Sequence, residues 1–487
     1  MGSRILTVLR VFSLILIMFS ATMVVPVIVS WIYQDGAQHA YDEGILITLV
    51  TGMLIWFATR HHKRDLQVKD GFLLVVLTWT ALPAFAAIPL LIFFWPKLSF
   101  TDAYFETVSG LTTTGATVLS GLDQLPFSIN LWRAELVWLG GMGLIVLATA
   151  ILPLLGVGGR QMFKAESPGP MKDSKLTPRI AETAKGLWAV YFAISAACVL
   201  SLRWAGMNWG DAVIHTGSIM GLGGFSSHDA SFGFFDSVPI EVVTEIFMTL
   251  AGFNFATHFL AVHRRSLHPY VRDPEAPWYV LVMWGSVAAV AFYLWYLGTY
   301  AQFWTALRYA AFNVVSIATT TGFANTDYGL WPMFAPLWML FLSSFVTSAG
   351  STGGGIKMIR AIILYKQTFR EIIHSMHPHA VRPIKVGGEP LPNKVVFAVL
   401  AFGFMYMVIV VSLTLLMAYS GLDIVTAFSA VVATINNTGP GLNQVGPSTT
   451  YAVLDDLQTW VCTIAMLVGR LEIFTVLVVL SPAFWRK

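Results

Sequence analysis

Long apolar runs recur along the whole chain at a length that suits a lipid bilayer. A helix crosses the hydrocarbon core with about 20 residues, and the first run carries no small-residue cleavage site of the A-x-A kind, so we expect a retained helix there. The pattern predicts an all-α polytopic membrane protein with ten spans. The predicted spans are 11–32, 44–60, 71–95, 131–157, 184–204, 238–262, 277–300, 331–348 with a continuation past a glycine break, 395–418 and 457–480.

Composition strengthens the membrane interpretation. The chain is 56% hydrophobic and 11% charged, whereas soluble domains are roughly 45–50% apolar and about 25% charged. So much apolar surface excludes a soluble enzyme. The net charge of +3 is too small to indicate a nucleic-acid partner. Cys198 and Cys462 both lie inside apolar runs, which excludes a disulfide framework and a cysteine-based metal site.

Lys and Arg are distributed unevenly around the predicted spans. Most of the 29 basic residues lie before the first span, in the loops 60–69, 160–185, 264–272 and 357–394, and at the C-terminus. The opposite loops hold only Lys97, Arg133, Arg203 and Arg308. By the positive-inside rule this bias places both termini in the cytoplasm. An even number of spans agrees, because it returns the chain to the side where it began.

A second pattern repeats four times on the predicted extracytoplasmic side. Each time a span is followed by a shorter apolar stretch, a segment rich in Thr, Asn or Gly, and another span. We call these the filter segments; they read TTTGAT at 112–117, GLGGFS at 221–226, TTTGFA at 319–324 and NNTGPG at 436–441. Aligning them on Gly115, Gly224, Gly322 and Gly439 places Ser109, Ser218, Ser316 and Ala433 six residues earlier, and Asp102 and Asp211 thirteen residues before the first two glycines. One such segment is typical of an ordinary turn, but four in register are not.

The apolar stretch before each filter segment, such as 102–111 or 211–220, has about the length of a half crossing. An Asp at its start favours a helix N-terminus on the outside, because a carboxylate there meets unpaired amides. The negative C-terminal end of the helix dipole then points at the membrane centre, where it suits a cation. Non-helical backbone at that depth must line a water-filled path or be buried in protein. The pattern therefore predicts four re-entrant pore helices around a cation filter of carbonyl oxygens.

The four filter segments and the spans around them resemble those of the TrkH subgroup of the Trk/Ktr/HKT potassium-transporter superfamily, and the resemblance covers nearly the whole chain. The resemblance implies four span–pore helix–span repeats in a pseudo-fourfold arrangement around one pore, preceded by two extra spans. The second filter segment lacks Thr and the fourth uses Asn, which leaves the ion preference slightly open. The implied division is two N-terminal helices at 1–66 and pore repeats at 67–160, 161–268, 269–385 and 386–487.

The resemblance implies that the aligned glycines and the residues just before them line the ion path. In plant-type relatives a serine at the first glycine position accompanies sodium transport. The residue here is Gly115, which implies a preference for potassium. The implied ion-lining residues are Thr113, Thr114, Gly115, Leu222, Gly223, Gly224, Thr320, Thr321, Gly322, Asn437, Thr438 and Gly439.

The stretch 347–357, which we call the Gly-rich loop, is similar to the intramembrane loop of the family. It does not match the phosphate-binding pattern G-x-x-x-x-G-K-[ST], because Ile356 intervenes and Met358 stands where Ser or Thr is required. We expect a flexible gate below the filter, since glycine-rich backbone moves easily. The expected gating residues of the loop are Gly350, Ser351, Thr352, Gly353, Gly354 and Gly355.

Arg470 is expected near mid-membrane in the last span, within a Gly-Arg-Leu-Glu stretch similar to the final-span motif of the family. An arginine at that depth costs about 2.5–3.5 kcal/mol on insertion scales, so it must face water or a partner. Glu472, two positions away, projects from a different side of the helix. We expect carbonyls of the Gly-rich loop to hold the guanidinium, which leaves its charge as a barrier in the K⁺ path. A salt bridge to another span is the alternative.

Three weaker patterns have ordinary explanations. The histidines His374, His377 and His379 lie in a basic segment without cysteine or a carboxylate cluster, so a metal site there is improbable. The sequon at 436–438 falls on a filter segment, where glycosylation cannot reach. Glu241 and Glu245 are expected on a solvated helix face near the outer end of a span, in preference to a cation-collecting mouth.

The function that follows is potassium uptake across a bacterial cytoplasmic (inner) membrane, with K⁺ as the transported ion and no organic cofactor. The alternative is a potassium symporter coupled to H⁺ or Na⁺. An intramembrane enzyme is not expected, because Asp455 and Asp456 are adjacent and diverge on a helix. The resemblance implies a homodimer surrounded by membrane lipid and a cytosolic nucleotide-binding regulatory subunit of the TrkA type, without nucleic acid. The basic loops 160–185 and 357–394 suit its docking, and they suit contact with anionic lipid equally well.

Overall fold

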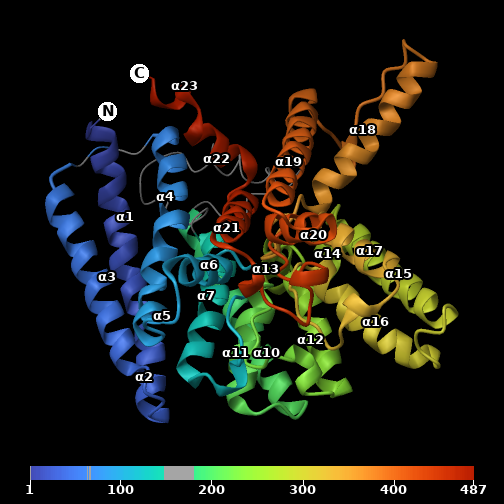
Figure 1. Cartoon of the computed structure of the whole chain (residues 1–487). Helices are drawn as coiled ribbons and strands as arrows, with labels where there is room; N and C mark the ends of the chain where they lie inside the picture. Colours follow the sequence, from blue (N-terminus) through green and yellow to red (C-terminus); the bar gives the residue numbers. More distant parts are fainter. Residues whose placement is uncertain (1, 63, 65–66, 147–179, 487) are drawn as a thin grey trace.

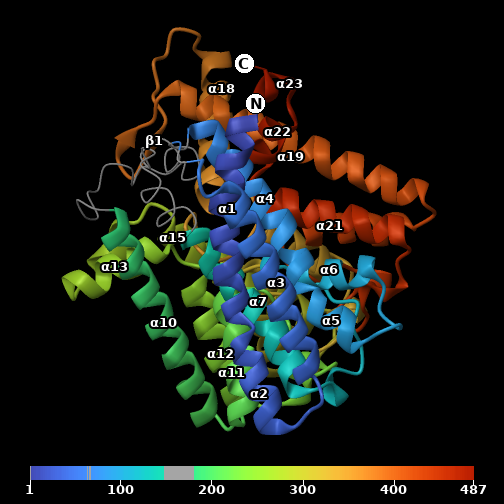
Figure 2. The ribbon, with the colours of Figure 1, turned by 90° about the vertical axis from the view of Figure 1, so that its left-hand side faces the viewer.

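The computed structural model describes residues 2–62, 64, 67–146 and 180–486, and this part of the chain is helical almost throughout (Figure 1). The first helices, α1 (Gly2–Thr22), α2 (Val24–Tyr33) and α3 (Gln38–Thr59), form an upright hairpin beside α4 (Val68–Ala86) (Figure 2). Both chain termini lie at the same end of the molecule (Figure 1). The described strands are β1 (Lys385–Val386) and β2 (Glu389–Pro390), which pair antiparallel in one small hairpin.

The other helices follow the alternation of long and short apolar stretches in the sequence. They are α5 (Ile88–Phe93), α6 (Phe100–Leu111), α7 (Phe127–Val146), α10 (Ile180–Trp204), α11 (Trp209–Gly221), α12 (Val238–Ala251), α13 (Phe255–Arg264), α14 (His268–Arg272), α15 (Ala276–Tyr296), α16 (Phe303–Ala318), α17 (Phe334–Ser343), α18 (Met358–Met376), α19 (Asn393–Tyr419), α20 (Ile424–Ile435), α21 (Asp456–Arg470), α22 (Ile473–Leu480) and α23 (Pro482–Trp485). Single turns of 3₁₀ helix are η1 (Leu122–Gln124), η4 (Ser231–Phe234), η5 (Tyr328–Leu330), η6 (Asn443–Val445) and η7 (Tyr451–Val453).

Long apolar helices confirm the prediction of a polytopic membrane fold. Within the described ranges, six helical stretches are long and apolar enough to cross a bilayer, and each coincides with a predicted span. Large apolar side chains such as Leu54, Phe292 and Leu415 are exposed on them, as expected of surfaces that face lipid. The six stretches are Arg4–Tyr33, Gln38–Thr59, Lys69–Phe93, Lys185–Trp204, Ala276–Tyr296 and Asn393–Tyr419.

Two predicted spans are not single helices, so the expectation of continuous spans at 238–262 and 457–480 is wrong. The first consists of α12 and α13 with a bend of 94°, and the second of α21 and α22 with a bend of 107°. The side chain of Asn254 caps α13 by accepting a hydrogen bond from the Ala256 amide, which starts a new helix. Glu472 has a φ of 55° and thereby ends the helical path after α21. Apolar length alone does not reveal such a change of direction.

The predicted span at 331–348 is also interrupted. Only α17, with 10 residues, is helical there, and the backbone runs irregularly from 344 to 357 before α18 begins. The predicted span at 131–157 is described as α7 up to Val146. Its last residues and most of the predicted basic loop 160–185 lie outside the described residues.

Four shorter helices, α6, α11, α16 and α20, stand where the pore helices are predicted. With 12 to 16 residues they are roughly 18–24 Å long. Asp102 and Asp211 do not start the first two helices, because Ser99 and Asn208 are the N-caps and each accepts a hydrogen bond from the amide of the Asp that follows. Both aspartates still lie in the first turn, where the helix dipole favours a negative charge.

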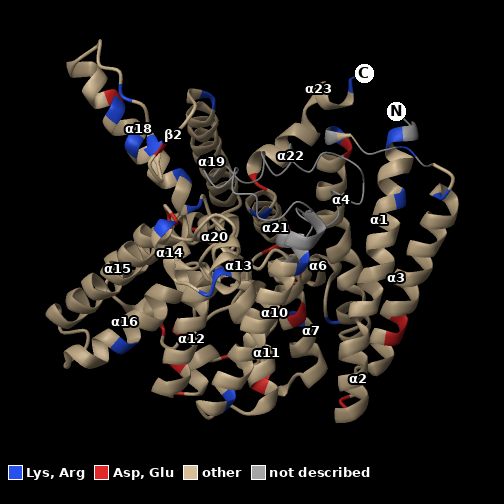
Figure 3. Cartoon of the chain, turned by 180° about the vertical axis from the view of Figure 1, so that it is seen from behind, with Lys and Arg blue, Asp and Glu red and all other residues tan. Residues whose placement is uncertain are grey.

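Basic side chains gather at one end of the molecule. Figure 3 shows most Lys and Arg residues of the described chain at the end where both termini lie, notably along α18. This distribution agrees with the predicted bias between the two sets of loops. The assignment of that end to the cytoplasm stays a prediction based on the positive-inside rule.

Candidate functional site

The four filter segments share one left-handed backbone position. In each, the residue two positions before the aligned glycine has a left-handed φ between 53° and 61°. Such a φ is uncommon for residues other than glycine and especially unfavourable for β-branched ones. Its recurrence at the same register confirms the alignment of the four segments. These residues are Thr113, Leu222, Thr320 and Asn437.

The same hydrogen bond closes each pore helix onto its filter segment. The amide just before the aligned glycine donates to the carbonyl five residues earlier: Thr114 to Ser109 (2.8 Å), Gly223 to Ser218 (3.0 Å), Thr321 to Ser316 (2.8 Å) and Thr438 to Ala433 (2.8 Å). The serines and the alanine that align in the sequence are therefore the acceptors of one repeated turn. This equivalence explains why Ala433 replaces serine at no cost to the turn, since the acceptor is backbone.

The filter segments close into a ring. A Cβ placed on Gly115 would lie 2.6 Å from the Gly224 nitrogen, and one on Gly224 would lie 2.6 Å from the Thr321 oxygen. A Cβ on Gly322 would meet the Thr438 oxygen, and one on Gly439 would lie 2.7 Å from the Thr114 oxygen. Each segment thus abuts the next in the order of the chain, and the fourth abuts the first. The structure brings together all of the predicted ion-lining residues.

Most carbonyl groups in this ring have no partner. Within the described chain, hydrogen bonds reach the carbonyl oxygens of Gly223, Thr321 and Gly439, from the Phe225 amide, the Gly224 amide and the Tyr451 hydroxyl respectively. Buried carbonyls without a hydrogen bond are unusual in folded proteins. The carbonyl oxygens of the ring can therefore accept a hydrogen bond or coordinate a cation. Among the described residues, the unpartnered carbonyls are those of the buried residues Thr113, Thr114, Leu222, Thr320, Asn437 and Thr438 and of the partly exposed Gly115, Gly224 and Gly322.

The Gly-rich loop lies directly against one end of the ring. The Gly354 amide donates to the Thr320 hydroxyl at 2.8 Å, which joins the loop to the third filter segment. The Thr352 hydroxyl donates to the Met220 carbonyl at 2.9 Å, near the end of the second pore helix. Thr320, Thr352 and Met220 are buried, so both contacts lie in the interior of the protein.

Arg470, at the end of α21, forms a hydrogen bond with this loop. Its guanidinium donates to the Thr352 carbonyl at 2.8 Å and to the Gly140 carbonyl at 3.1 Å, and the side chain is 4% exposed. The predicted contact with a loop carbonyl is present, and the described part of the chain offers Arg470 no salt bridge. Arg470 is the last residue of α21 and does not lie inside a continuous span; a helix C-terminus is a favourable place for a positive charge. Glu472 pairs with Arg360 at 2.7 Å instead.

Two further charged side chains, of Lys357 at the end of the loop and of Glu275 beside it, contact the loop, and the sequence analysis assigned no role to either. The Lys357 ammonium donates to the Gly353 carbonyl and lies 3.5 Å from the Ser351 hydroxyl. Lys357 was predicted to start a cytoplasmic basic loop, yet its ammonium lies inside the Gly-rich loop. Glu275, 4% exposed, accepts hydrogen bonds from the Ala349 amide (2.8 Å) and the Ile359 amide (3.1 Å) with one oxygen. Glu275 thereby ties the entry of the loop to its exit, a contact for which the sequence holds no signal.

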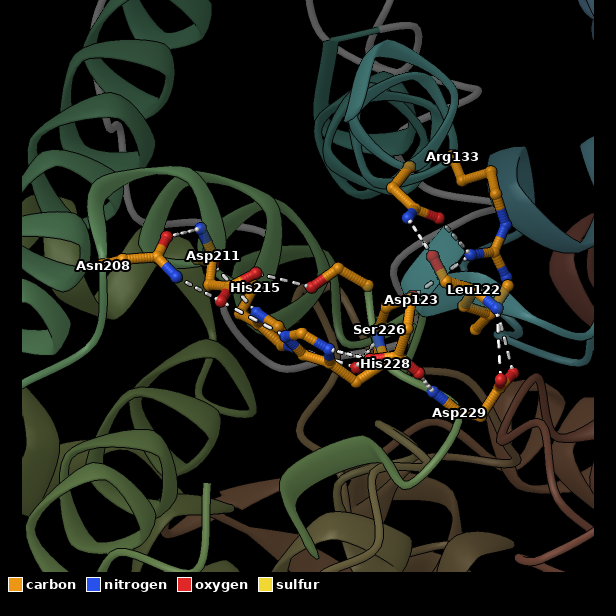
Figure 4. Close-up of polar contacts among 11 residues, drawn as sticks. Leu122, Asp123, Arg133, Asn208, Asp211, His215, Ser226, His228 and Asp229 are labelled. Atoms are coloured by element: carbon orange, nitrogen blue, oxygen red, sulfur yellow. Dashed lines mark hydrogen bonds and ion pairs between the residues drawn. The ribbon is translucent and has the colours of Figure 1, made fainter. Parts of the chain in front are cut away.

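An ion pair lies behind the ring on its other side. Arg133 donates to Glu106 at 2.8 Å, and both side chains are 1% exposed. Arg133 also contacts Asn130 and the Ser226 carbonyl (Figure 4). The positive-inside count treated Arg133 as a charge of an extracytoplasmic loop, but it is buried in α7.

A polar cluster lies beyond this ion pair, where the second filter segment leaves the ring. Figure 4 shows the His228 ring between Asp123 and Asp211, with distances of 2.5 and 3.2 Å from its two nitrogens to the carboxylates. Burial lowers the pKa of His228, but hydrogen bonds and charge attraction from Asp211 and Asp123 outweigh it and raise the pKa above 6.5. The same contacts lower the pKa of Asp123 against the effect of its partial burial.

The other expectations have mixed outcomes. Glu241 and Glu245 are both buried, so the expected solvated face is wrong; Glu241 pairs with Arg308 through two contacts of 2.8 Å, which holds α12 against α16. The His374 ring contacts the Ala380 carbonyl at 2.7 Å. Among the described residues, no group of three His, Cys, Asp or Glu side chains is arranged to hold a metal, and this includes His377 and His379.

Comparison with known proteins gives concordant matches. The model of a family described as TrkH, cation transport protein, matches residues 37–487. The chain is 46% identical over 481 residues to the Trk system potassium uptake protein TrkH of Halomonas elongata, covering 99% of both chains, and 44% identical over 479 residues to that of Escherichia coli, covering 98% of this chain and 99% of the other. The crystal structure of the potassium transporter TrkH from Vibrio parahaemolyticus is similar with a TM-score of 0.90 and 43% identity, covering 99% of this chain and 100% of that one.

Proposed function

The chain belongs to the TrkH family of cation transport proteins, and we propose that it takes up potassium through the ring of filter segments. The relatives are named as potassium uptake proteins or transporters, which makes this a transport function and not an enzymatic one. The twelve implied ion-lining residues form the selectivity filter of this proposal.

One observation carries the proposal. Carbonyl oxygens of all four filter segments converge in one ring, and most of them accept no hydrogen bond from the described residues. A potassium ion that enters the membrane must exchange its water shell for other oxygen ligands, and a ring of carbonyls supplies them. The C-terminal ends of α6, α11, α16 and α20 reach the same ring, and their negative dipole ends favour a cation there.

Gating residues follow from the contacts below the ring. We propose that Gly350, Ser351, Thr352, Gly353, Gly354 and Gly355 block the path in this conformation, and that Arg470 adds a positive barrier. The bond between Gly354 and Thr320 and the bond between Arg470 and Thr352 support this assignment. Lys357 adds a second positive charge beside the loop. Opening then requires the loop to leave both contacts.

Location and assembly complete the proposal. The protein is a multi-pass membrane protein, and we place it in a bacterial cytoplasmic membrane with both termini inside, supported by the basic end seen in Figure 3. The division into two N-terminal helices and four pore repeats belongs to the same proposal. We propose a homodimer that binds a cytosolic nucleotide-binding subunit of the TrkA type; the basic, protruding α18 suits its docking.

Flux measured with the purified chain in liposomes tests the function. We expect Rb⁺ and K⁺ to enter down their gradients, while empty liposomes stay tight and Na⁺ enters more slowly. Collapsing a proton gradient, or removing Na⁺ from both sides, at a clamped membrane potential distinguishes the alternative of a coupled symporter, because only symport then stops. Folded protein that passes neither Rb⁺ nor K⁺ under any of these gradients would contradict the proposal.

A further inference from the structure

The position nine residues before each aligned glycine lies on the pore helix of its repeat and is equivalent in all four repeats. It is occupied by Glu106, His215, Asn313 and Ala430 in the four repeats. The first three side chains are buried at 0–1% exposure, although carboxylate, imidazole and amide groups rarely lie inside a membrane domain without a partner. A polar residue at this position therefore requires a specific contact.

Each of the three polar residues ties its pore helix to the chain that leaves the filter. Glu106 accepts hydrogen bonds from the Thr117 hydroxyl and the Val118 amide, both at 2.9 Å. His215 lies 3.0 Å from the Ser226 hydroxyl, and Asn313 donates to Asn325 at 2.6 Å.

The fourth repeat makes the same kind of tie from the neighbouring position. Ala430 has no polar group, but the hydroxyl of Ser429 accepts a hydrogen bond from the Leu442 amide at 2.9 Å. In every repeat, a side chain of the pore helix therefore forms a hydrogen bond with the chain two or three residues after the aligned glycine. The four fastenings differ in chemistry, and one of them carries charge.

The ion pair of Glu106 with Arg133 also contacts the second repeat. The Arg133 guanidinium donates to Glu106 (2.8 Å), to the Thr117 hydroxyl (3.1 Å) and to the Ser226 carbonyl (3.1 Å). Its central carbon lies 4.3 Å from the centre of the Phe225 ring. Thr117 follows the first filter glycine, whereas Phe225 and Ser226 follow the second. The ion pair therefore fixes the distance between the first two filter segments, next to the contact of Gly115 with Gly224.

We propose that Glu106 and Arg133 are positioning residues that determine cation selectivity by holding these two filter segments at the spacing that suits potassium. The inference rests on the proposed filter and adds residues that do not touch the ion. A buried ion pair gives little net stability, because desolvation offsets its attraction. Its value here is geometric, since a guanidinium offers five donors in a rigid plane.

The test compares Rb⁺ with Na⁺ uptake in cells that lack other potassium uptake, normalised to the amount of folded protein. Glu106→Gln keeps the shape but loses the charge-assisted hydrogen bonds. We expect the Rb⁺/Na⁺ ratio to fall at least about tenfold, which corresponds to 1.4 kcal/mol. Glu241→Gln is the control, because Glu241 is also buried and also pairs with an arginine, the partly exposed Arg308, but this pair joins α12 to α16 instead of two filter segments. Its ratio should stay at the wild-type value.

A double variant separates positioning from folding. Glu106→Gln combined with Arg133→Met removes both charges and leaves no bare buried charge, so the protein should fold better than either single variant. A low Rb⁺/Na⁺ ratio that persists in this well-folded double variant supports positioning. A wild-type ratio in both Glu106→Gln and the double variant overturns the inference, provided that Gly115→Ser lowers the ratio. If Gly115→Ser also leaves it unchanged, the proposed filter itself is wrong.

Discussion

Residues with left-handed backbone set the geometry of the filter. Asn437 is a natural choice for such a φ, because asparagine tolerates it better than other side chains do. Thr113 and Thr320 adopt the same φ despite a branched Cβ. Backbone held in such regions costs of order 1–3 kcal/mol and persists where the surroundings enforce it, which is common at functional sites. Here the surroundings are the neighbouring filter segments.

Gly115 tests the filter most directly. We expect Gly115→Ser to admit Na⁺ and to lower the Rb⁺/Na⁺ uptake ratio at least about tenfold. The Cβ of a serine at this position would lie 2.6 Å from the Gly224 nitrogen, and the φ of 80° disfavours a side chain, so the two segments must move apart. Gly121→Ser is the control, since Gly121 has a φ of 70° with open space around it. Equal ratios in both variants would count against the filter assignment.

His228 predicts a pH-dependent stability. Its pKa is raised in the folded protein, so the protonated ring stabilises the fold below pH 6.5 and this contribution disappears as pH rises through the raised pKa. The groups that face the ring are Asp123, Asp211 and His215. We expect the melting temperature of wild type to exceed that of His228→Gln at about pH 6 and to converge with it at about pH 9. A difference independent of pH, measured in detergent, would show that the charged form is not what stabilises.

At the scale of elements, one hydrogen bond among the described residues joins the Gly-rich loop to a filter segment, and its acceptor is the side chain of Thr320. Thr320→Val keeps the shape but removes the hydroxyl that accepts from the Gly354 amide. We expect the loop to open more readily and basal Rb⁺ flux to rise about five- to tenfold, since a neutral hydrogen bond is worth about 1 kcal/mol. Thr113→Val is a closely matched control: the same register in the first repeat, a similar φ, and a hydroxyl without a partner among the described residues. If both variants conduct alike, the bond does not hold a gate.

Arg470 joins the end of α21 to the loop. Arg470→Ala should raise K⁺ flux per folded molecule, because the positive charge and the bond to the Thr352 carbonyl are both lost. Arg470→Lys keeps the charge but not the two-pronged contact with Thr352 and Gly140, so we expect an intermediate flux. The measurement is flux in liposomes divided by the amount of monodisperse protein. A stable Arg470→Ala protein that is slower than wild type would refute the barrier.

At the scale of the whole molecule, the sequence pattern predicted those features that short stretches of sequence determine by themselves. Apolar length located the membrane helices, and the recurrence of glycine located the four filter segments. The bends after Ala251 and Arg470 were not predicted, because the helices on the two sides of each bend together still have the length and mean hydropathy of one membrane span. The pairing of Glu106 with Arg133, 27 positions apart in the chain, and the clamp by Glu275 on Ala349, 74 positions away, depend on tertiary packing that no periodicity records.

The four repeats are alike around the filter and unlike below it, and this has a mechanical consequence. Among the described residues, the Gly-rich loop follows α17 and leads into α18 alone, so the proposed gate would open from one side of the pore and not around its whole circumference. The Gly-rich loop is continuous with α18, which begins at Met358 and protrudes from the end of the molecule where both termini lie (Figure 1). With 19 residues this helix is a lever roughly 28 Å long. If the loop is the proposed gate, a partner that moves the far end of α18 acts on the loop directly through this one helix.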